Sequence, residues 1–104
     1  MNLKISYLYR DSGNYKTFGT AVFTNQRCIA LKTVLEALRA RLLDGEWFYP
    51  EMFELPTLFG EFFSPLDDPG WHEFESLEET EEEANYGDIC FLMEKMGDGK
   101  IGWK

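Results

Sequence analysis

The chain has 104 residues, 44% of them hydrophobic and 16% aromatic, so it can build one core but is too short for two ordinary domains. Its formal net charge is −9, and its aromatic content argues against a disordered acidic tail, because such tails lack rings that pack. The longest apolar run, Ile89 to Met93, is far shorter than the roughly 20 residues of a membrane-spanning helix, and the first ten residues lack a signal-peptide stretch. We therefore expect a single domain over residues 1–104, located in the cytoplasm.

The first two predicted elements form a β-hairpin. Residues 3–10 read LKISYLYR, and the larger side chains at every second position are typical of a strand with one better-buried face. Residues 11–14, DSGN, are turn formers. Residues 15–24 are rich in β-branched and aromatic side chains, so they predict the second strand.

A helix with one apolar stripe is predicted next. Its start is left open between Thr24 or Asn25, which can cap an early beginning, and Ala30, where ordinary helix formers begin. Gly45 is expected to end it. One such helix packs naturally over one face of a hairpin sheet. The stripe consists of Leu31, Val34, Leu35, Leu38 and Leu42, at spacings of i, i+3, i+4, i+7 and i+11.

Two further strands and a long connection are expected between residues 46 and 77. Residues 46–53, EWFYPEMF, offer a third strand that Pro50 confines to an edge or ends early. Residues 55–70 contain three prolines and two glycines among large rings, which indicates an ordered connection without regular structure. Residues 70–77, GWHEFESL, alternate again and predict the fourth strand.

The C-terminal segment has two interpretations, and the sequence does not decide whether residues 78–87 are ordered. Asp88 can cap a short helix that Gly97 closes; alternatively, residues 90–96 and 100–104 form a hairpin. We favour the helix. The expected fold class is therefore α+β, a two-layer arrangement with a mainly antiparallel sheet in the order β-β-α-β-β and a C-terminal helix.

Four strings occur in the order YLYRDSGNYKTFGTAVFTN, LLDGEWFYPE, LPTLF and WHEFESLEETEE, and together they cover most of residues 5–83. This set resembles a group of small acidic bacterial proteins. The resemblance implies a bacterial, cytoplasmic, single-domain protein. No activity is assigned to that group, so the resemblance supplies no catalytic or binding residue.

Acidic and basic residues are divided between the two halves of the chain. Residues 1–43 hold seven basic against two acidic residues, whereas residues 44–104 hold three against seventeen. Between Asp44 and Glu94 there are sixteen acidic residues and no Lys or Arg. Seven glutamates fall within residues 73–83, where mutual repulsion is unavoidable.

Two interpretations of this acidic segment stay open. In one, the basic half neutralises part of it, and the rest is a solvated face that keeps the protein soluble. In the other, it docks a basic partner protein, because clustered carboxylates raise association rates. The second is our leading hypothesis, with neighbouring aromatic side chains adding contact area. The candidate partner-binding residues are Glu73, Glu75, Glu78, Glu79, Glu81, Glu82, Glu83, Trp47 and Tyr49.

An alternative hypothesis places a small hydrolase-like enzyme around His72, the only histidine. A general base needs an orienting carboxylate within reach. The serines lie in no nucleophile motif, so covalent catalysis has no signature. We expect a binding protein rather than an enzyme, and we assign no catalytic residue. The groups that such an enzyme would gather with His72 are Asp67, Asp68, and Arg10 or Asp11.

A further alternative is a nucleic-acid contact through the basic N-terminal half, using Arg10, Lys16, Arg39 and Arg41. We do not expect this contact, because a net charge of −9 opposes nucleic-acid affinity. The sequence leaves the oligomeric state open.

Cys28 and Cys90 stand 62 positions apart, with no second thiol or histidine pair beside them. This spacing excludes a metal knuckle or a CxxC redox motif. We expect both to be buried, reduced thiols. Neither a metal nor a cofactor is expected.

Overall fold

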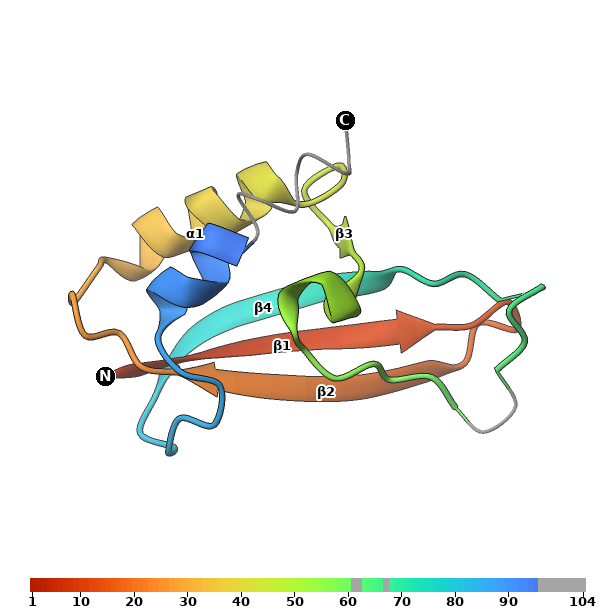
Figure 1. Cartoon of the computed structure of the whole chain (residues 1–104), viewed down its shortest axis with the longest axis horizontal. Helices are drawn as coiled ribbons and strands as arrows, with labels where there is room; N and C mark the ends of the chain where they lie inside the picture. Colours follow the sequence, from red (N-terminus) through yellow and green to blue (C-terminus); the bar gives the residue numbers. More distant parts are fainter. Residues whose placement is uncertain (61–62, 67, 96–104) are drawn as a thin grey trace.

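The structure is a computed structural model that describes residues 1–60, 63–66 and 68–95 (Figure 1). It has an α+β fold with a four-stranded sheet, as the sequence predicts. Residues 89–95 are helical, so the C-terminal segment begins as the predicted helix and not as the alternative hairpin. Met96 and Gly97 lie outside the described residues. The named elements are β1 (Asn2–Arg10), β2 (Lys16–Phe23), α1 (Leu31–Arg41), β3 (Trp47–Phe48), the 3₁₀ turn η1 (Pro50–Phe53) and β4 (His72–Thr80).

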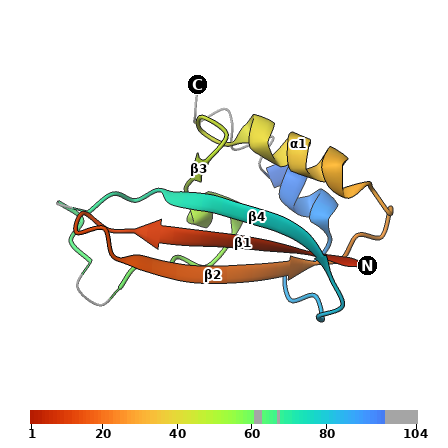
Figure 2. The same ribbon diagram turned by 180° about the vertical axis from the view of Figure 1, so that it is seen from behind.

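The strand order in the sheet is β2-β1-β4-β3, and every pairing is antiparallel. The β1–β2 hairpin forms as predicted. The last strand, β4, lies against the other side of β1 (Figure 2). The register between β1 and β4 shifts between Ser6 and Tyr7. This pairing brings the acidic part of the chain beside the basic part, so that Lys4 lies opposite Glu78.

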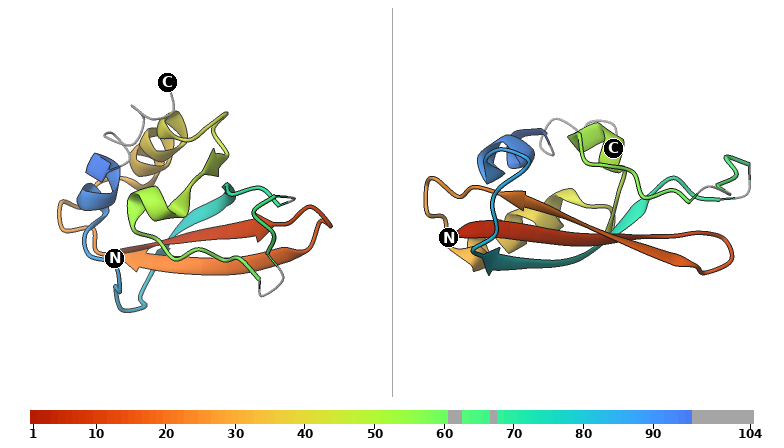
Figure 3. Two further views of the ribbon diagram at one scale, coloured as in Figure 1. Left: turned by 45° about the vertical axis from the view of Figure 1, so that its right-hand side comes forward. Right: turned by 90° about the horizontal axis from the view of Figure 1, so that it is seen from below.

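The core lies on one face of the sheet. Alternate side chains of β1, Leu3, Ile5 and Tyr7, are buried there, and Val34 and Leu38 of α1 pack against the same cluster. Figure 1 and the left view of Figure 3 show α1, η1 and the helical residues 89–95 on this side of the strands. The other members of the core are Ala21, Phe23, Leu42, Phe48, Phe53, Leu55, Phe74, Leu77, Ile89 and Leu92.

Helix α1 ends at Arg41, so the predicted end at Gly45 is wrong. Asp44 and Gly45 instead have φ values of 52° and 73°. Leu43 accepts hydrogen bonds from the N–H groups of Glu46 at 3.0 Å and Trp47 at 2.9 Å. Positive φ at two successive residues is the geometry of a primed hairpin turn, for which Asp-Gly is a favoured pair. This glycine therefore belongs to a turn that leads into β3.

We call residues 54–71 the connecting segment; it is irregular wherever the structure describes it. Hydrogen bonds attach it to the sheet. The hydroxyl groups of Tyr7 and Tyr9 donate hydrogen bonds of 2.7 Å to the carbonyl oxygens of Pro56 and Pro69. Burial raises the pKa of Tyr7 to about 12. The hydroxyl groups of these two tyrosines therefore hold the connecting segment against the sheet.

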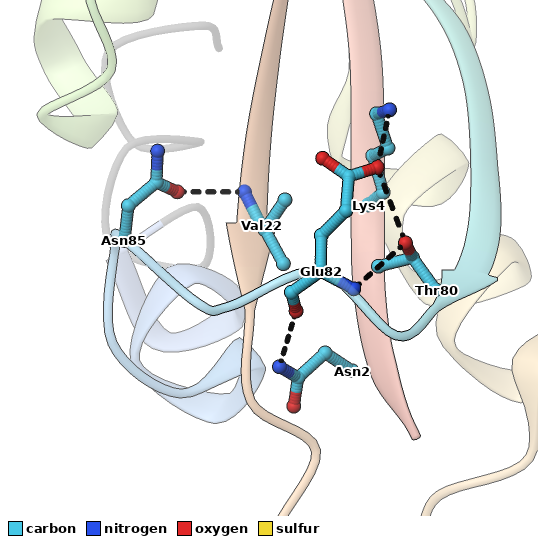
Figure 4. A network of polar contacts seen from close by, with 6 residues as sticks. All are labelled: Asn2, Lys4, Val22, Thr80, Glu82 and Asn85. Carbon is cyan, nitrogen blue, oxygen red and sulfur yellow. Dashed lines mark hydrogen bonds and ion pairs between the residues drawn. The ribbon is translucent and has the colours of Figure 1, made fainter.

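After β4 the chain crosses β1 and reaches the outer edge of β2 (Figure 4). Asn2 donates a 2.8 Å hydrogen bond to the carbonyl oxygen of Glu82, and Lys4 forms a 2.7 Å ion pair with the same residue. Asn85 then accepts the N–H of Val22 through its side chain at 3.0 Å. Residues 81–85 are thus bonded to two strands that precede them by about 60 to 80 positions.

Asp88 caps the C-terminal helix, as predicted. Its carboxylate accepts the N–H of Cys90 at 3.0 Å, the N–H of Gln26 at 3.0 Å and the hydroxyl of Thr24 at 2.8 Å. Burial alone raises the pKa of Asp88, but these hydrogen bonds outweigh it and lower the pKa below its ordinary value. One carboxylate therefore joins the start of this helix to the turn after β2.

The two cysteines are free thiols with different exposure. Cys90 is half-buried, but Cys28 is exposed at a positive φ of 50°, so the expectation of two buried thiols is wrong for Cys28. Within the described residues, we find no helix with the length and apolar character needed to cross a membrane.

Candidate functional site

His72 is a structural residue in the core. It is fully buried; Nε2 accepts the N–H of Leu58 at 2.9 Å, and Nδ1 lies 3.3 Å from the carbonyl oxygen of Gly70. The second contact makes Nδ1 the protonated nitrogen, because a carbonyl oxygen only accepts. Burial lowers the pKa of His72 below its ordinary value of 6.5. Both ring nitrogens are therefore occupied by backbone groups, and the imidazole is neutral.

The candidate groups that the structure describes, Asp68, Arg10 and Asp11, are bonded to residues other than His72. Asp68 accepts hydrogen bonds from Ser12 and from the N–H of Ser64. Arg10 pairs with Glu73, and Asp11 accepts the N–H of Tyr15. Asp67 lies outside the described residues. These contacts hold the β1–β2 turn and the connecting segment in place.

Of the seven candidate glutamates, two are paired with the basic half of the chain. Arg10 bonds to Glu73 at 2.8 Å, and Lys4 bonds to Glu82 at 2.7 Å. The hydrogen bond from Lys4 lowers the pKa of Glu82. The other five are exposed, and the structure gives them no ion pair among the described residues. We call these five the acidic surface: Glu75, Glu78, Glu79, Glu81 and Glu83.

A pocket of about 350 Å³ is lined by Leu43, Asp44, Trp47 and Trp71. We call it the tryptophan pocket. Trp47 is half-buried and Trp71 is 46% exposed. The walls are mainly apolar, with the Asp44 carboxylate as the only charged group among the described lining residues. Small-molecule and side-chain sites have this composition, a mostly apolar concavity with few polar groups.

Three elements position the lining of this pocket. The Asp44–Gly45 turn carries Asp44 and ends in β3, where Trp47 pairs with Glu73 of β4. Trp71 directly precedes β4. The ring of Tyr49 meets Trp71 edge to face at 6.5 Å, so it supports one wall from outside the pocket.

Sequence reasoning named Trp47, which lines the pocket, and Tyr49, which lies outside it, but it did not name the lining residues Leu43, Asp44 and Trp71. The Asp44–Gly45 pair was an available signal, because Asp-Gly between apolar residues favours a tight hairpin turn. Trp71 had no such signal. It reaches the pocket only because β4 pairs with β3.

The candidate nucleic-acid residues are largely engaged within the molecule. Arg39 donates a 2.9 Å hydrogen bond to the carbonyl oxygen of Gly45 and lies 5.0 Å from the ring centre of Phe74. Arg41 donates to the carbonyl oxygen of Ala37, and Arg10 pairs with Glu73. No group of three or more metal-ligating side chains comes together within residues 1–60, 63–66 and 68–95.

Comparison of this chain with protein-family models, with curated proteins and with solved structures finds no significant match. The resemblance to small bacterial proteins therefore stays an expectation from the sequence. The candidate site rests on its own geometry, an acidic surface and a tryptophan pocket joined by β4.

Proposed function

We propose that this chain is a cytoplasmic, single-domain binding protein that docks a basic partner protein through its acidic surface. In this proposal the domain has the two-layer β-β-α-β-β arrangement expected from the sequence. The observation that carries it is the exposure of five glutamates without an ion pair among the described residues. Like charges held close together repel one another, and a cationic partner relieves that repulsion.

The paired glutamates help to define this surface. Glu82 and Glu73 are held by Lys4 and Arg10, so their charge is already partly compensated. Glu82 also carries the backbone hydrogen bond that fixes the turn after β4. Glu81 and Glu83 flank Glu82 in this turn, so the hydrogen bond to Glu82 also restrains their backbone. Such pre-ordering reduces the entropy lost when a partner binds.

The test is binding of a short arginine-rich peptide, measured by fluorescence anisotropy at low and at high salt. One variant carries Glu79→Lys, Glu81→Lys and Glu83→Lys. A control variant with the same net charge carries Glu36→Lys, Glu51→Lys and Glu94→Lys, at three exposed positions outside the acidic surface.

The first variant should lose binding, while the control should keep most of it. Affinity should also fall steeply with salt, because exposed charges are screened within about 8 Å at physiological ionic strength. Equal loss in the two variants would show that the peptide responds only to net charge, and it would leave the acidic surface as a solvated face.

A further inference from the structure

We propose that the tryptophan pocket binds an arginine side chain of the basic partner, with the two indoles stacking on the guanidinium and Asp44 as its counter-charge. This inference rests on the proposed function and specifies what the partner must present. It extends the docking contact from the acidic surface to a defined cavity of about 350 Å³.

The two indole rings suit a flat cation. Trp47 and Trp71 both line the pocket, and indole is the aromatic ring that attracts cations most strongly. A guanidinium group is planar and weakly hydrated, so it stacks on aromatic faces at a low desolvation cost. Leu43 adds an apolar wall that the methylene stem of arginine can cover.

The charge inside the pocket favours a cation over a neutral or anionic ligand. Asp44 has no ion pair among the described residues. Arg39, the basic side chain bonded to the same turn, is occupied by the carbonyl oxygen of Gly45 and by the ring of Phe74. The span from Asp44 to Glu94 contains no Lys or Arg, so no basic residue of that span can neutralise the carboxylate.

The pocket is formed before any ligand arrives. The turn that carries Asp44 is closed by hydrogen bonds from Glu46 and Trp47 to Leu43. Tyr49 braces Trp71, and a side-chain carbon at Gly70 would lie 3.3 Å from the Tyr49 ring, so this glycine leaves room for the brace. A pre-formed site loses little side-chain entropy when it binds.

The occupant is a partner protein rather than a second copy of this chain. Asp44, Trp47 and Trp71 of the lining belong to the acidic part of the sequence, and a copy presenting its acidic surface would be repelled. Lysine is a poorer occupant than arginine, because its ammonium is compact and strongly hydrated.

The experiment uses the 104-residue chain carrying Trp103→Phe, which leaves Trp47 and Trp71 as its only indoles. The probes are Nα-acetyl-arginine amide, its neutral isostere Nα-acetyl-citrulline amide, and Nα-acetyl-lysine amide. The two indole N–H resonances are followed by NMR during each titration.

The same titrations are repeated with the variants Trp71→Ala and Asp44→Asn. Asparagine tolerates the left-handed backbone at position 44. Glu94→Gln, which lines a different pocket, is the matched charge control.

Both indole resonances should shift saturably with the arginine probe and much less with the citrulline probe. Trp71→Ala should weaken arginine binding about tenfold. Asp44→Asn should weaken it about threefold to fivefold, while Glu94→Gln leaves it unchanged. Equal shifts with citrulline and arginine would overturn the cation site. Shifts that depend on protein concentration without any probe would assign the pocket to a second copy and also overturn the proposal.

The two proposals fail separately. Loss of peptide binding in the glutamate variant, with no response of the indoles to arginine, would keep the acidic surface and reject the pocket. An indole response to arginine, with peptide binding that is equally affected in the control variant, would keep the pocket as an arginine site and reject the acidic surface.

Discussion

The imidazole Nε2 of His72 accepts a 2.9 Å hydrogen bond from the backbone N–H of Leu58, fourteen residues earlier in the chain. His72 lies at the start of β4, and Leu58 lies in the connecting segment. The rings of Tyr9 and Phe59 lie with their centres 4.9 Å and 5.4 Å from the imidazole centre. The residue that sequence reasoning considered as a catalytic base therefore attaches an irregular segment to the sheet.

His72→Phe should lower the free energy of unfolding by about 1–3 kcal/mol, because the N–H of Leu58 would lose its acceptor in the protein interior. Urea denaturation followed by tryptophan fluorescence measures the change. Glu79→Ala, at an exposed position of the same strand, should change stability by less than about 0.5 kcal/mol. Equal stability of His72→Phe and the parent would contradict the structural role of the ring.

The stability should fall as the pH drops below about 6.5, the ordinary pKa of histidine. Burial lowers the pKa of His72 in the folded chain, so in that range the unfolded chain binds a proton that the folded chain does not. Protonation therefore favours unfolding, and the stabilisation is complete above the unfolded pKa and lost below it. Unfolding free energies measured at several pH values in parent and His72→Phe should show a smaller slope in the variant; identical slopes would refute the assignment.

Gly19→Ala should loosen the connecting segment. A side-chain carbon at this position of β2 would lie 2.7 Å from a methyl group of Leu58, so Leu58 has to move. The contacted atoms end the flexible, half-buried side chain of Leu58, so the cost should lie at the low end of the about 1–3 kcal/mol of overpacking, and amide hydrogen exchange at Leu58 should accelerate. Gly60→Ala is the matched control, because nothing lies within 4 Å of the added carbon. Unaltered exchange at Leu58 in Gly19→Ala would show that the segment accommodates the methyl group.

Asp88→Ala should lower the free energy of unfolding by about 1–2 kcal/mol, the usual cost of losing a helix N-cap. The carboxylate also accepts bonds from Gln26 and Thr24, so the turn after β2 should exchange its amide protons faster as well. Glu94→Ala, an exposed change in the same helix, serves as the control. If amide protection falls only in the C-terminal helix and not in the turn after β2, then Asp88 does not couple these two segments.

Local patterns were sufficient for much of the fold. The two-residue alternation in residues 3–10 and 70–77 fixed which segments are strands, and the leucine spacing of residues 31–42 fixed the helix, because these periods follow from backbone geometry alone. Pro50 correctly predicted an early end to the third strand. Asp88 was identifiable as a cap because a carboxylate there reaches a nearby N–H group.

The assembly of the candidate site was not readable in the same way. Whether a given glutamate is paired depends on which strand lies beside it, and only the placement of β4 against β1 decided that Glu73 meets Arg10. Trp71 joins Trp47 for the same reason, through the pairing of β3 with β4.

The sequence by itself determined the elements, the division of charge and the surplus of carboxylates, because these depend on neighbouring residues and on composition. The tertiary structure alone decided which carboxylates are compensated, where His72 is buried and that two distant tryptophans form a pocket. The physical reason is that these features come from contacts between residues far apart in the chain, whose energies are settled only when the strands pair and the core closes.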